Sequence, residues 1–361
     1  MHGLVIADIH FGKKDDKRLY KELEEVFFKK IEKEGKSLDI IVIAGDLYDR
    51  SLKLIESIYP DNFIRKLIEY SIKYDFLIRI IKGTKTHDYD QLDVLDHYQD
   101  KYFPRFKLIK KVEEEALLND IVVLYLPEEY ISNPKEYYKD YFTNEDGKYD
   151  MIFAHGTFDF VSYVPNIESE RVVQSAPTFK AKELSSYSYG PIISGHIHIR
   201  ESWKNKIYYT GSFSRFCFGE EKTKGFIEFN YDPESLDSNI KYIINKKAPK
   251  YTTFYLEDLE GNSLEEKINI LNELKDQYEH IRIKSKINNE KDAGLIKELL
   301  STKDNQNNIK IEIQKEDKEE IDKKYMFILE RKYDIPTTVQ KYIELKNNKK
   351  IDINIIKDFL S

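Results

Sequence analysis

The chain has 361 residues, of which 40% are hydrophobic and 34% are charged. This composition is typical of a soluble globular protein of about two domains, and it excludes disordered and collagen-like chains. The apolar runs are far shorter than the roughly 18 residues that a membrane-spanning helix needs, so we expect no membrane contact. The formal net charge of −7 neither favours nor excludes a nucleic-acid partner, because bound divalent cations offset an acidic site locally.

Two features predict a cytoplasmic protein. The N-terminus carries no basic stretch, and Asp8 interrupts the first apolar run before a signal-peptide core forms. The single cysteine, Cys217, has no partner for an intrachain disulfide, which agrees with a reducing compartment. A cysteine-based zinc cage is also excluded, so any metal must be bound by His, Asp, Glu or Asn side chains.

The first two thirds of the chain alternate short apolar runs with amphipathic stretches. This pattern predicts an α/β domain over residues 1–248, with strands that are buried on both faces. Helices are expected at 19–33 and 63–74, where apolar side chains recur on one face. The expected strands are 4–7, 40–44, 76–81, 121–126, 151–154, 192–194, 207–209 and 226–229.

The pattern changes at residues 246–250, which are rich in lysine and include Pro249, and we expect a domain boundary there. Residues 249–315 then predict a small α+β domain, and residues 316–361 predict a charged linker followed by a helical hairpin. The hairpin is too small to bury its own apolar face, so it packs either on the body of the protein or on a partner. The expected elements are strands 252–256, 281–285 and 309–313, helices 264–278 and 292–300, linker 315–324, and hairpin helices 338–345 and 353–360.

Carboxylates and imidazoles follow five of the expected strands. Because open α/β sheets bind ligands beyond the carboxyl ends of their strands, we expect these side chains to meet at one site. Residues i and i+2 of an extended segment point to the same side, so Asp8 with His10, and His196 with His198, are each able to offer two donors to one centre. The five segments are Asp8-Ile9-His10, Gly45 to Arg50, Gly83 to Asp88, His155-Gly156 and Gly195 to His198.

Mixed carboxylate and imidazole ligands suit Mn²⁺, Fe²⁺ or Zn²⁺ better than Ca²⁺. With this many ligands and one carboxylate free to bridge, a pair of ions about 3.5–4 Å apart is the economical arrangement, and it is typical of enzymes that hydrolyse phosphate esters. The sequence contains no G-x-S-x-G segment that would favour a serine nucleophile instead.

In their order and setting, these five segments resemble the motifs of the calcineurin-like metallophosphoesterases. The resemblance covers residues 1–230 and implies a two-sheet sandwich flanked by helices. It implies that Asp49 orients a catalytic histidine, His87, which acts on the leaving group, and that Arg50 contacts phosphate. It also implies that Asp8, His10 and His198 hold one ion, that His155 and His196 hold the other, and that Asp46 bridges them.

The segment after the last motif resembles one particular group within this superfamily. Residues 209–212, Arg215, 218–221 and 224–226 are similar to the corresponding segment of the SbcD-type DNA repair nucleases. Members of that family carry a small capping domain and a C-terminal helical hairpin, which binds the coiled-coil base of an SbcC-type ATPase. The resemblance therefore implies a homodimeric nuclease that hydrolyses DNA phosphodiester bonds with two Mn²⁺ ions, as part of a DNA repair and recombination complex.

Two alternatives stay open. The first is another two-metal phosphoesterase of the same superfamily, either a protein phosphatase or a small-nucleotide phosphodiesterase, and the ATPase-docking hairpin disfavours it. The second is an inactive subunit that binds DNA ends, and the presence of His87 disfavours it.

One position departs from the family pattern. The family has an asparagine ligand directly before the catalytic histidine, whereas this chain has Thr86 there and two extra residues after Gly83. We expect Thr86 to take the ligand position, although a hydroxyl is a poorer donor than an amide oxygen. A main-chain carbonyl, a water, or a carboxylate such as Asp88 or Asp90 is the alternative.

Overall fold

The computed structural model describes residues 1–88, 90–142, 148–161, 178–261, 263–274, 277–285, 308–313, 334–347 and 352–360. The chain divides into two compact units. Met1–Thr253 and Leu274–Ile281 form the first, and Phe254–Glu273 and Arg282–Ser361 form the second. Among the described residues, no helix combines the length and the hydrophobicity that crossing a membrane requires.

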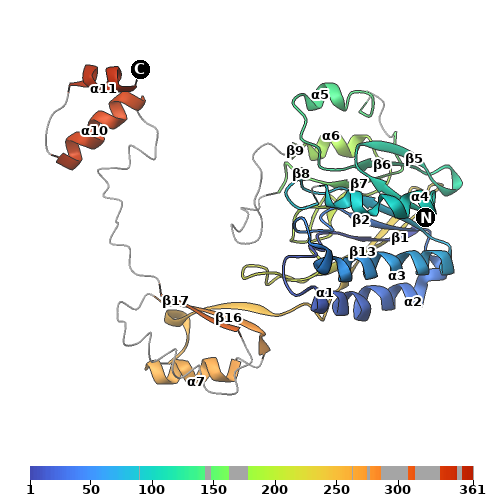
Figure 1. Ribbon diagram of the computed structural model, residues 1–361, viewed down its shortest axis with the longest axis horizontal. Coiled ribbons are helices and arrows are strands. Elements are labelled where there is room, and N and C mark those ends of the chain that lie inside the picture. Colours follow the sequence, from blue (N-terminus) through green and yellow to red (C-terminus); the bar gives the residue numbers. More distant parts are fainter. Residues whose placement is uncertain are drawn as a thin grey trace. The chain divides into compact units, whose positions relative to one another are not determined.

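The first unit contains two six-stranded sheets (Figure 1). In the first sheet, four neighbouring strands are parallel, and two antiparallel strands extend it beyond β1. Its order is β14 (Ser238–Ile244), β13 (Gly225–Tyr231), β1 (His2–Ile6), β2 (Ile40–Ala44), β3 (Leu77–Ile81) and β4 (Phe106–Ile109).

The second sheet also has a parallel centre, and an antiparallel strand closes each edge. Its order is β11 (Glu201–Trp203), β12 (Ile207–Tyr209), β10 (Ile192–Gly195), β7 (Met151–His155), β6 (Val122–Leu126) and β5 (Glu113–Ala116). A separate pair of short strands joins β8 (Thr157–Phe158) to β9 (Thr178–Phe179).

The two sheets stack on one another, and helices cover their outer faces. Along β2, Ile41 and Ile43 belong to the cluster that packs under the helices, whereas Val42 belongs to the cluster between the sheets, which also contains Phe153 and Phe229. Burial on both faces explains why the central strands are continuous apolar runs. Figure 1 shows α1 to α3 beyond the first sheet and α6 beyond the second.

The helix expected at 19–33 is present as one helical segment with a π-helical turn in its middle: α1 (Asp16–Glu22), η1 (Leu23–Phe28) and α2 (Lys29–Glu34). Asp15 begins it by accepting a hydrogen bond from the main-chain N–H of Arg18. The helix expected at 63–74 begins earlier, as α3 (Ile58–Tyr74). The remaining helical elements of this unit are η2 (Gly35–Ser37), η3 (Leu54–Ser57), η4 (Gln91–Leu95), α4 (Asp96–Tyr102), η5 (Leu118–Asp120), α5 (Pro134–Tyr137) and α6 (Ala181–Ser186).

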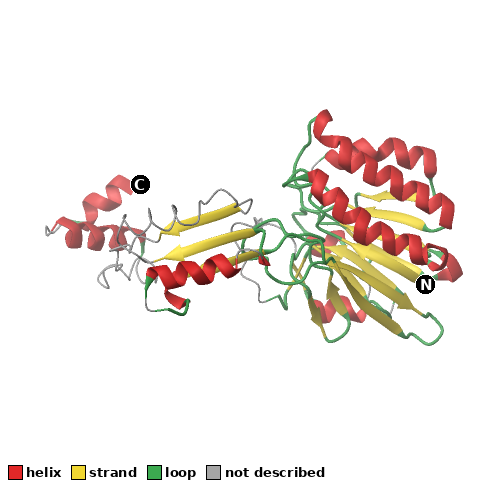
Figure 2. Cartoon of the chain, turned by 90° about the horizontal axis from the view of Figure 1, so that it is seen from below, coloured by secondary structure: helices red, strands yellow, loops and turns green. Residues whose placement is uncertain are grey.

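The rest of the chain forms a small α+β arrangement and two C-terminal helices. A three-stranded sheet contains β15 (Tyr251–Tyr255), β16 (His280–Ser285) and β17 (Asn308–Ile313), and Figure 2 shows a helix, α7 (Leu264–Leu274), alongside it. The helices α10 (Ile335–Asn347) and α11 (Ile353–Leu360) contact each other. The expected helix 292–300 and linker 315–324 lie outside the described residues, while η6 (Leu256–Asp258) was not expected.

Candidate metal centre

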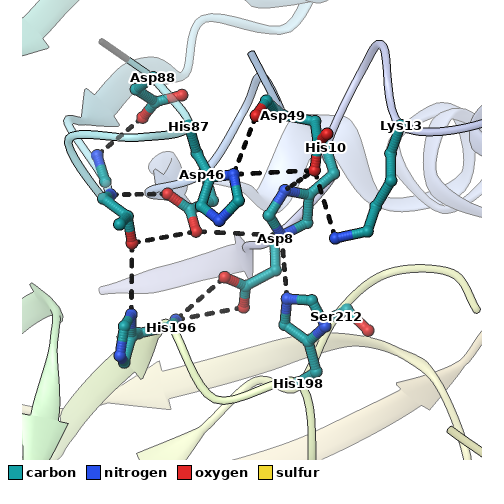
Figure 3. A network of polar contacts seen from close by, with 12 residues as sticks. Asp8, His10, Lys13, Asp46, Asp49, His87, Asp88, His196, His198 and Ser212 are labelled. Atoms are coloured by element: carbon teal, nitrogen blue, oxygen red, sulfur yellow. Dashed lines mark hydrogen bonds and ion pairs between the residues drawn. The ribbon is translucent and has the colours of Figure 1, made fainter. Parts of the chain in front are cut away.

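Side chains that follow six parallel strands come together where the two sheets meet (Figure 3). The first sheet provides Asp8 and His10 after β1, Asp46 and Asp49 after β2, and Thr84 and His87 after β3. The second sheet provides Glu128 after β6, His155 at the end of β7, and His196 and His198 after β10.

The backbone at this site is tightly turned. Asp8, His10, Asp46 and His196 all have positive φ angles, of 51°, 54°, 51° and 88°. Such angles are uncommon for residues other than glycine, and they persist where the surrounding structure enforces them, often at functional sites. Here the main-chain N–H of Asp8 donates to the carbonyl of Gly45 at 3.1 Å, and that of His10 donates to the carbonyl of Asp46 at 3.0 Å.

Two glycines permit the close approach of the strand ends. Gly45 has a φ of +85°, and a Cβ there would lie 2.0 Å from Nδ1 of His155. A Cβ on Gly83 would lie 2.2 Å from Oδ1 of Asp46. A larger residue at either position would displace a side chain of the site.

The first ligand cluster contains Asp8, His10 and His198, which are buried and whose ligand atoms lie within 4.8 Å of one another. Nε2 of His10 is 2.9 Å from Nε2 of His198. The opposite nitrogen of His198, Nδ1, donates to Glu220 at 2.8 Å, which fixes the ring with Nε2 toward His10. Burial raises the pKa of Glu220, but Lys224 and His198 hold it well below its usual range, so this carboxylate is ionised.

The second ligand cluster contains Asp46, His155 and His196, which are also buried and within the same mutual distance of 4.8 Å. Nδ1 of His155 donates to the carbonyl of Ala44 at 2.8 Å, so Nε2 faces Oδ1 of Asp46, 3.4 Å away. Burial lowers the pKa of His155, but the nearby Asp46 carboxylate raises it to about 10. Without a bound cation, His155 is therefore protonated at neutral pH.

Asp46 lies between the two clusters. While Oδ1 faces His155, Oδ2 lies 3.9 Å from Nε2 of His10. A carboxylate whose two oxygens face two sets of ligands has the placement that bridging requires.

The donors of both clusters fit divalent ions. Two ligand atoms about 2.1 Å from one ion lie roughly 3.0–4.2 Å apart, depending on the angle between them. The observed separations, 2.9 Å between His10 and His198 and 3.4 Å between Asp46 and His155, are close to or within this range. Nitrogen and carboxylate donors together suit Mn²⁺, Fe²⁺ or Zn²⁺.

His87 lies beside the first cluster and is partly exposed. Its ring contacts that of His10 edge-on with centroids 4.7 Å apart, and its Nδ1 donates to the main-chain carbonyl of Asp49 at 2.9 Å. The Asp49 carboxylate is 3.3 Å from Nδ1 of His10 and 3.2 Å from Nζ of Lys13, but 3.7 Å from Nδ1 of His87. The main chain of Asp49 thus orients His87, while its carboxylate faces His10 and Lys13.

Arg50 has a different setting. Its side chain is 46% exposed, and its guanidinium donates to both carboxylate oxygens of Glu56, at 2.7 and 3.1 Å. In this arrangement Arg50 is held by a surface ion pair.

Thr86, which was expected at the ligand position, is exposed, and the threonine that lies beside the second cluster is Thr84. Thr84 is 3% exposed, its N–H donates to Oδ1 of Asp46 at 2.6 Å, and its Oγ1 lies 3.3 Å from Nε2 of His155. The main-chain N–H of His87 donates to the carbonyl of Thr84 at 2.9 Å. The two extra residues, Lys85 and Thr86, therefore form an exposed turn between Thr84 and His87.

The two carboxylates considered as alternatives for this position, Asp88 and Asp90, have other settings. Asp88 is buried, but its two carboxylate oxygens accept the main-chain N–H groups of Tyr48 at 3.0 Å and Gly83 at 2.7 Å. Burial and the charge of Asp46 raise the pKa of Asp88 to about 7. Asp88 thus fastens the loop, and Asp90 is exposed.

Besides Thr84, two residues at the site were not predicted, Glu128 and Glu220. Glu128 is 4% exposed, and its Oε2 lies 3.2 Å from Nδ1 of His196. The sequence position of Glu128 could have identified it, because Glu128 follows the strand expected at 121–126, just as the other segments follow their strands. Glu220, the partner of His198, lies in the segment 218–221 that resembles the SbcD-type nucleases, where no role was assigned to it.

The profile of the calcineurin-like phosphoesterase family matches residues 1–200, and the chain belongs to this family of metal-dependent phosphoesterases. The chain is also similar to a particular protein, the D subunit of the SbcCD nuclease of Staphylococcus epidermidis (strain ATCC 12228 / FDA PCI 1200). The two are 26% identical over an alignment of 314 residues that covers 77% of this chain and 77% of the relative. The match to one solved structure covers 67% of this chain and 98% of the chain in that structure, with 13% sequence identity and a TM-score of 0.37.

Proposed function

We propose that this chain is the nuclease subunit of an SbcCD-like complex and hydrolyses phosphodiester bonds of DNA with two divalent ions, preferentially Mn²⁺. The observation that carries the proposal is the placement of the partly exposed His87 beside two buried ligand clusters, with Asp46 between the clusters. The similarity to the SbcCD nuclease of Staphylococcus epidermidis supports DNA as the substrate.

In this mechanism Asp8, His10 and His198 would hold one ion, His155 and His196 the other, and Asp46 would contact both. Ions held by these residues would supply Lewis acidity toward phosphate and a hydroxide nucleophile near neutral pH.

His87 acts on the leaving group. Because Nδ1 of His87 donates to the carbonyl of Asp49, the other ring nitrogen, Nε2, is left to serve the substrate. That nitrogen stabilises or protonates the oxygen that leaves, which is the role of a general acid.

The proposal extends to the rest of the chain. Residues 249–315 would form a capping domain over DNA, and the hairpin within 316–361 would bind the coiled coil of an SbcC-type ATPase. The hairpin presents apolar surface that suits a partner helix, because Ile355 is 66% exposed while the neighbouring Ile356 is buried. In this assignment the protein works as a homodimer in the cytoplasm, in DNA repair and recombination.

The test uses the full-length protein after removal of metal with EDTA. With Mn²⁺ added, we expect it to degrade linear duplex DNA or circular single-stranded DNA, and renewed EDTA to stop the reaction. A phosphomonoester substrate is run in parallel, and Asp46→Asn is the inactive control. Hydrolysis of the monoester alone would contradict the proposal and favour another phosphoesterase, whereas DNA binding without hydrolysis of any substrate would favour an inactive subunit.

A further inference from the structure

A carboxylate that the family's motifs do not provide, that of Glu128, lies beside the second ligand cluster. Glu128 follows β6 of the second sheet, and its Oε2 lies 3.2 Å from Nδ1 of His196 and 3.8 Å from Nε2 of His155. Nε2 of His155 is also the nitrogen that faces Asp46. Glu128 therefore approaches the same centre as Asp46, from the opposite sheet.

These distances fit a shared ion. Ligand atoms about 2.1 Å from one ion lie roughly 3.0–4.2 Å apart, and both separations from Glu128 fall within this range. Nε2 of His155 is the ring nitrogen that faces the cluster, because Nδ1 donates to the Ala44 carbonyl. The carboxylate and the imidazoles thus direct atoms that are able to bind a metal ion into one buried space, where a bound ion would replace the proton of His155.

The other oxygen of Glu128 is held in place. The hydroxyl of Tyr130 donates to Oε1 at 2.5 Å, which leaves Oε2 toward the cluster. The main-chain N–H of Glu128 donates to the carbonyl of Lys82 at 3.4 Å and so links the ends of β6 and β3. Carboxylates that bind metals are commonly fixed by a hydrogen bond of this kind on the side away from the ion.

Thr84 explains why the site needs an additional ligand. Its Oγ1 donates to Oε2 of Glu128 at 3.1 Å, and Thr84 directly follows Gly83, as the family's asparagine follows its glycine. A neutral hydroxyl is a weak ligand for Mn²⁺, and without Glu128 the cluster would offer only one carboxylate, from Asp46, to a buried divalent ion.

We propose that Glu128 is a ligand of the second metal ion, in place of the family's asparagine, and that Tyr130 is the positioning residue that aims it. The inference rests on the proposed two-metal function, but it concerns only the binding of an ion to the second cluster.

The test measures Mn²⁺ binding to the metal-free, full-length protein, by calorimetry and by the electron paramagnetic resonance signal of free Mn²⁺. We expect two ions per chain in the unchanged protein. Glu128→Gln should keep one ion and bind the other at least about tenfold more weakly, and Tyr130→Phe should weaken the same ion to a smaller extent.

Glu129→Gln is the matched control, because it makes the same change one residue away. The Glu129 carboxylate accepts hydrogen bonds from the N–H of Val112 and the hydroxyl of Tyr137, both at 2.9 Å, and not from residues of the cluster. We expect its Mn²⁺ binding to equal that of the unchanged protein.

Unchanged binding of both ions in Glu128→Gln would overturn the inference, even with lowered thermal stability, because Glu128 would then only compensate buried imidazolium charge. Where circular dichroism shows that Glu128→Gln is unfolded, Glu128→Asp and Tyr130→Phe decide, and unchanged affinity in both overturns the inference. If every variant binds two ions and the unchanged protein cleaves DNA, the inference about Glu128 fails and the proposed function stands. If the unchanged protein neither binds metal nor cleaves DNA, the inference and the proposed function both fail.

Discussion

Glu220 fixes the imidazole of His198. Oε1 of Glu220 accepts from Nδ1 of His198 at 2.8 Å, and the opposite nitrogen of the ring lies 2.9 Å from Nε2 of His10. Glu220 is itself held, because Oε2 accepts the main-chain N–H of Phe216 at 2.8 Å and lies 3.6 Å from Nζ of Lys224. This buried carboxylate therefore orients the candidate ligand His198, while Glu220 itself is not a member of the ligand cluster.

We predict that Glu220→Gln weakens Mn²⁺ binding at the first cluster by about tenfold or more, because the ring of His198 loses its charged partner. Titration of the metal-free protein with Mn²⁺ measures this effect. Glu221→Gln is the control, since Glu221 is exposed and next in the chain. Equal affinities in the two variants would show that Glu220 has no part in metal binding.

His87→Ala should lower DNA hydrolysis by about 100-fold or more, the usual contribution of a general acid. Its Mn²⁺ content should stay nearly unchanged, because His87 contacts Asp49 and the ring of His10 and is partly exposed to substrate. Activity and metal content are measured on the same preparation. Loss of both ions would instead identify His87 as a ligand.

Gly45→Ala should destabilise the first unit and impair the second cluster. The positive φ at Gly45 strains any other residue, and the added Cβ would overlap the ring of His155. We expect a loss of more than about 1 kcal/mol of unfolding free energy, measured by urea unfolding of the metal-free protein. Gly156→Ala is the control, because the nearest atom to its Cβ would be a ring carbon of Phe179 at 3.3 Å. Similar losses in both variants would contradict the steric argument.

The metal-free protein should become less stable as the pH rises from about 7 to 9.5. The pKa of His155 is raised to about 10 in the folded state, mainly by Asp46 acting against burial, and lies near 6.5 in the unfolded chain. Over this range the folded state binds more protons than the unfolded state. The contribution of protonated His155 to the free energy of unfolding is therefore fully present below the pKa of the unfolded chain, and it is lost as the pH rises toward the pKa of the folded state.

Urea unfolding at several pH values measures this dependence, and His155→Gln should show a smaller slope. Added Mn²⁺ should displace the proton of His155, so a weakly buffered solution at about pH 8 should acidify as metal binds. An equal slope in His155→Gln, or metal binding without proton release, would show that His155 is not the titrating group.

The central strands were predictable because burial on both faces makes them continuous apolar runs. All eight strands expected in the first unit are present, two with the expected bounds and six with shifted ends. The strands that were not predicted include β5, which contains three glutamates, and β14, which is largely polar or exposed. Both are edge strands, where one neighbour is missing and the apolar signal is weak.

The sequence predicts that the strand ends meet at one site. It does not predict which threonine of the segment Gly83 to Asp88 lies beside the cluster. Counting back from His87 places Thr86 at the ligand position, whereas the backbone is fixed at Gly83, whose packing against Asp46 brings Thr84 to the cluster. Glu128 shares the strand-end position of the other segments, but its approach to His196 depends on the strand order β10-β7-β6 in the second sheet, which no local pattern reports.

The different positions of Thr84 and Thr86 lead to a rescue experiment. If Glu128 supplies the ligand that an asparagine gives elsewhere in the family, an amide introduced at the buried position should restore what Glu128→Gln loses. We expect the double variant Glu128→Gln, Thr84→Asn to bind the second Mn²⁺ more tightly than Glu128→Gln alone, because an amide oxygen is a better donor than a hydroxyl. Thr86→Asn in the same background should have no effect, since Thr86 is exposed.

Titration of the three proteins in parallel measures the rescue, and circular dichroism confirms that each is folded. Rescue by Thr86→Asn but not by Thr84→Asn would show that the loop after Gly83 carries its ligand position two residues further along. Absence of rescue at both positions, in folded proteins, would show that space beside Asp46 and His155 admits the short threonine side chain but not a ligating amide.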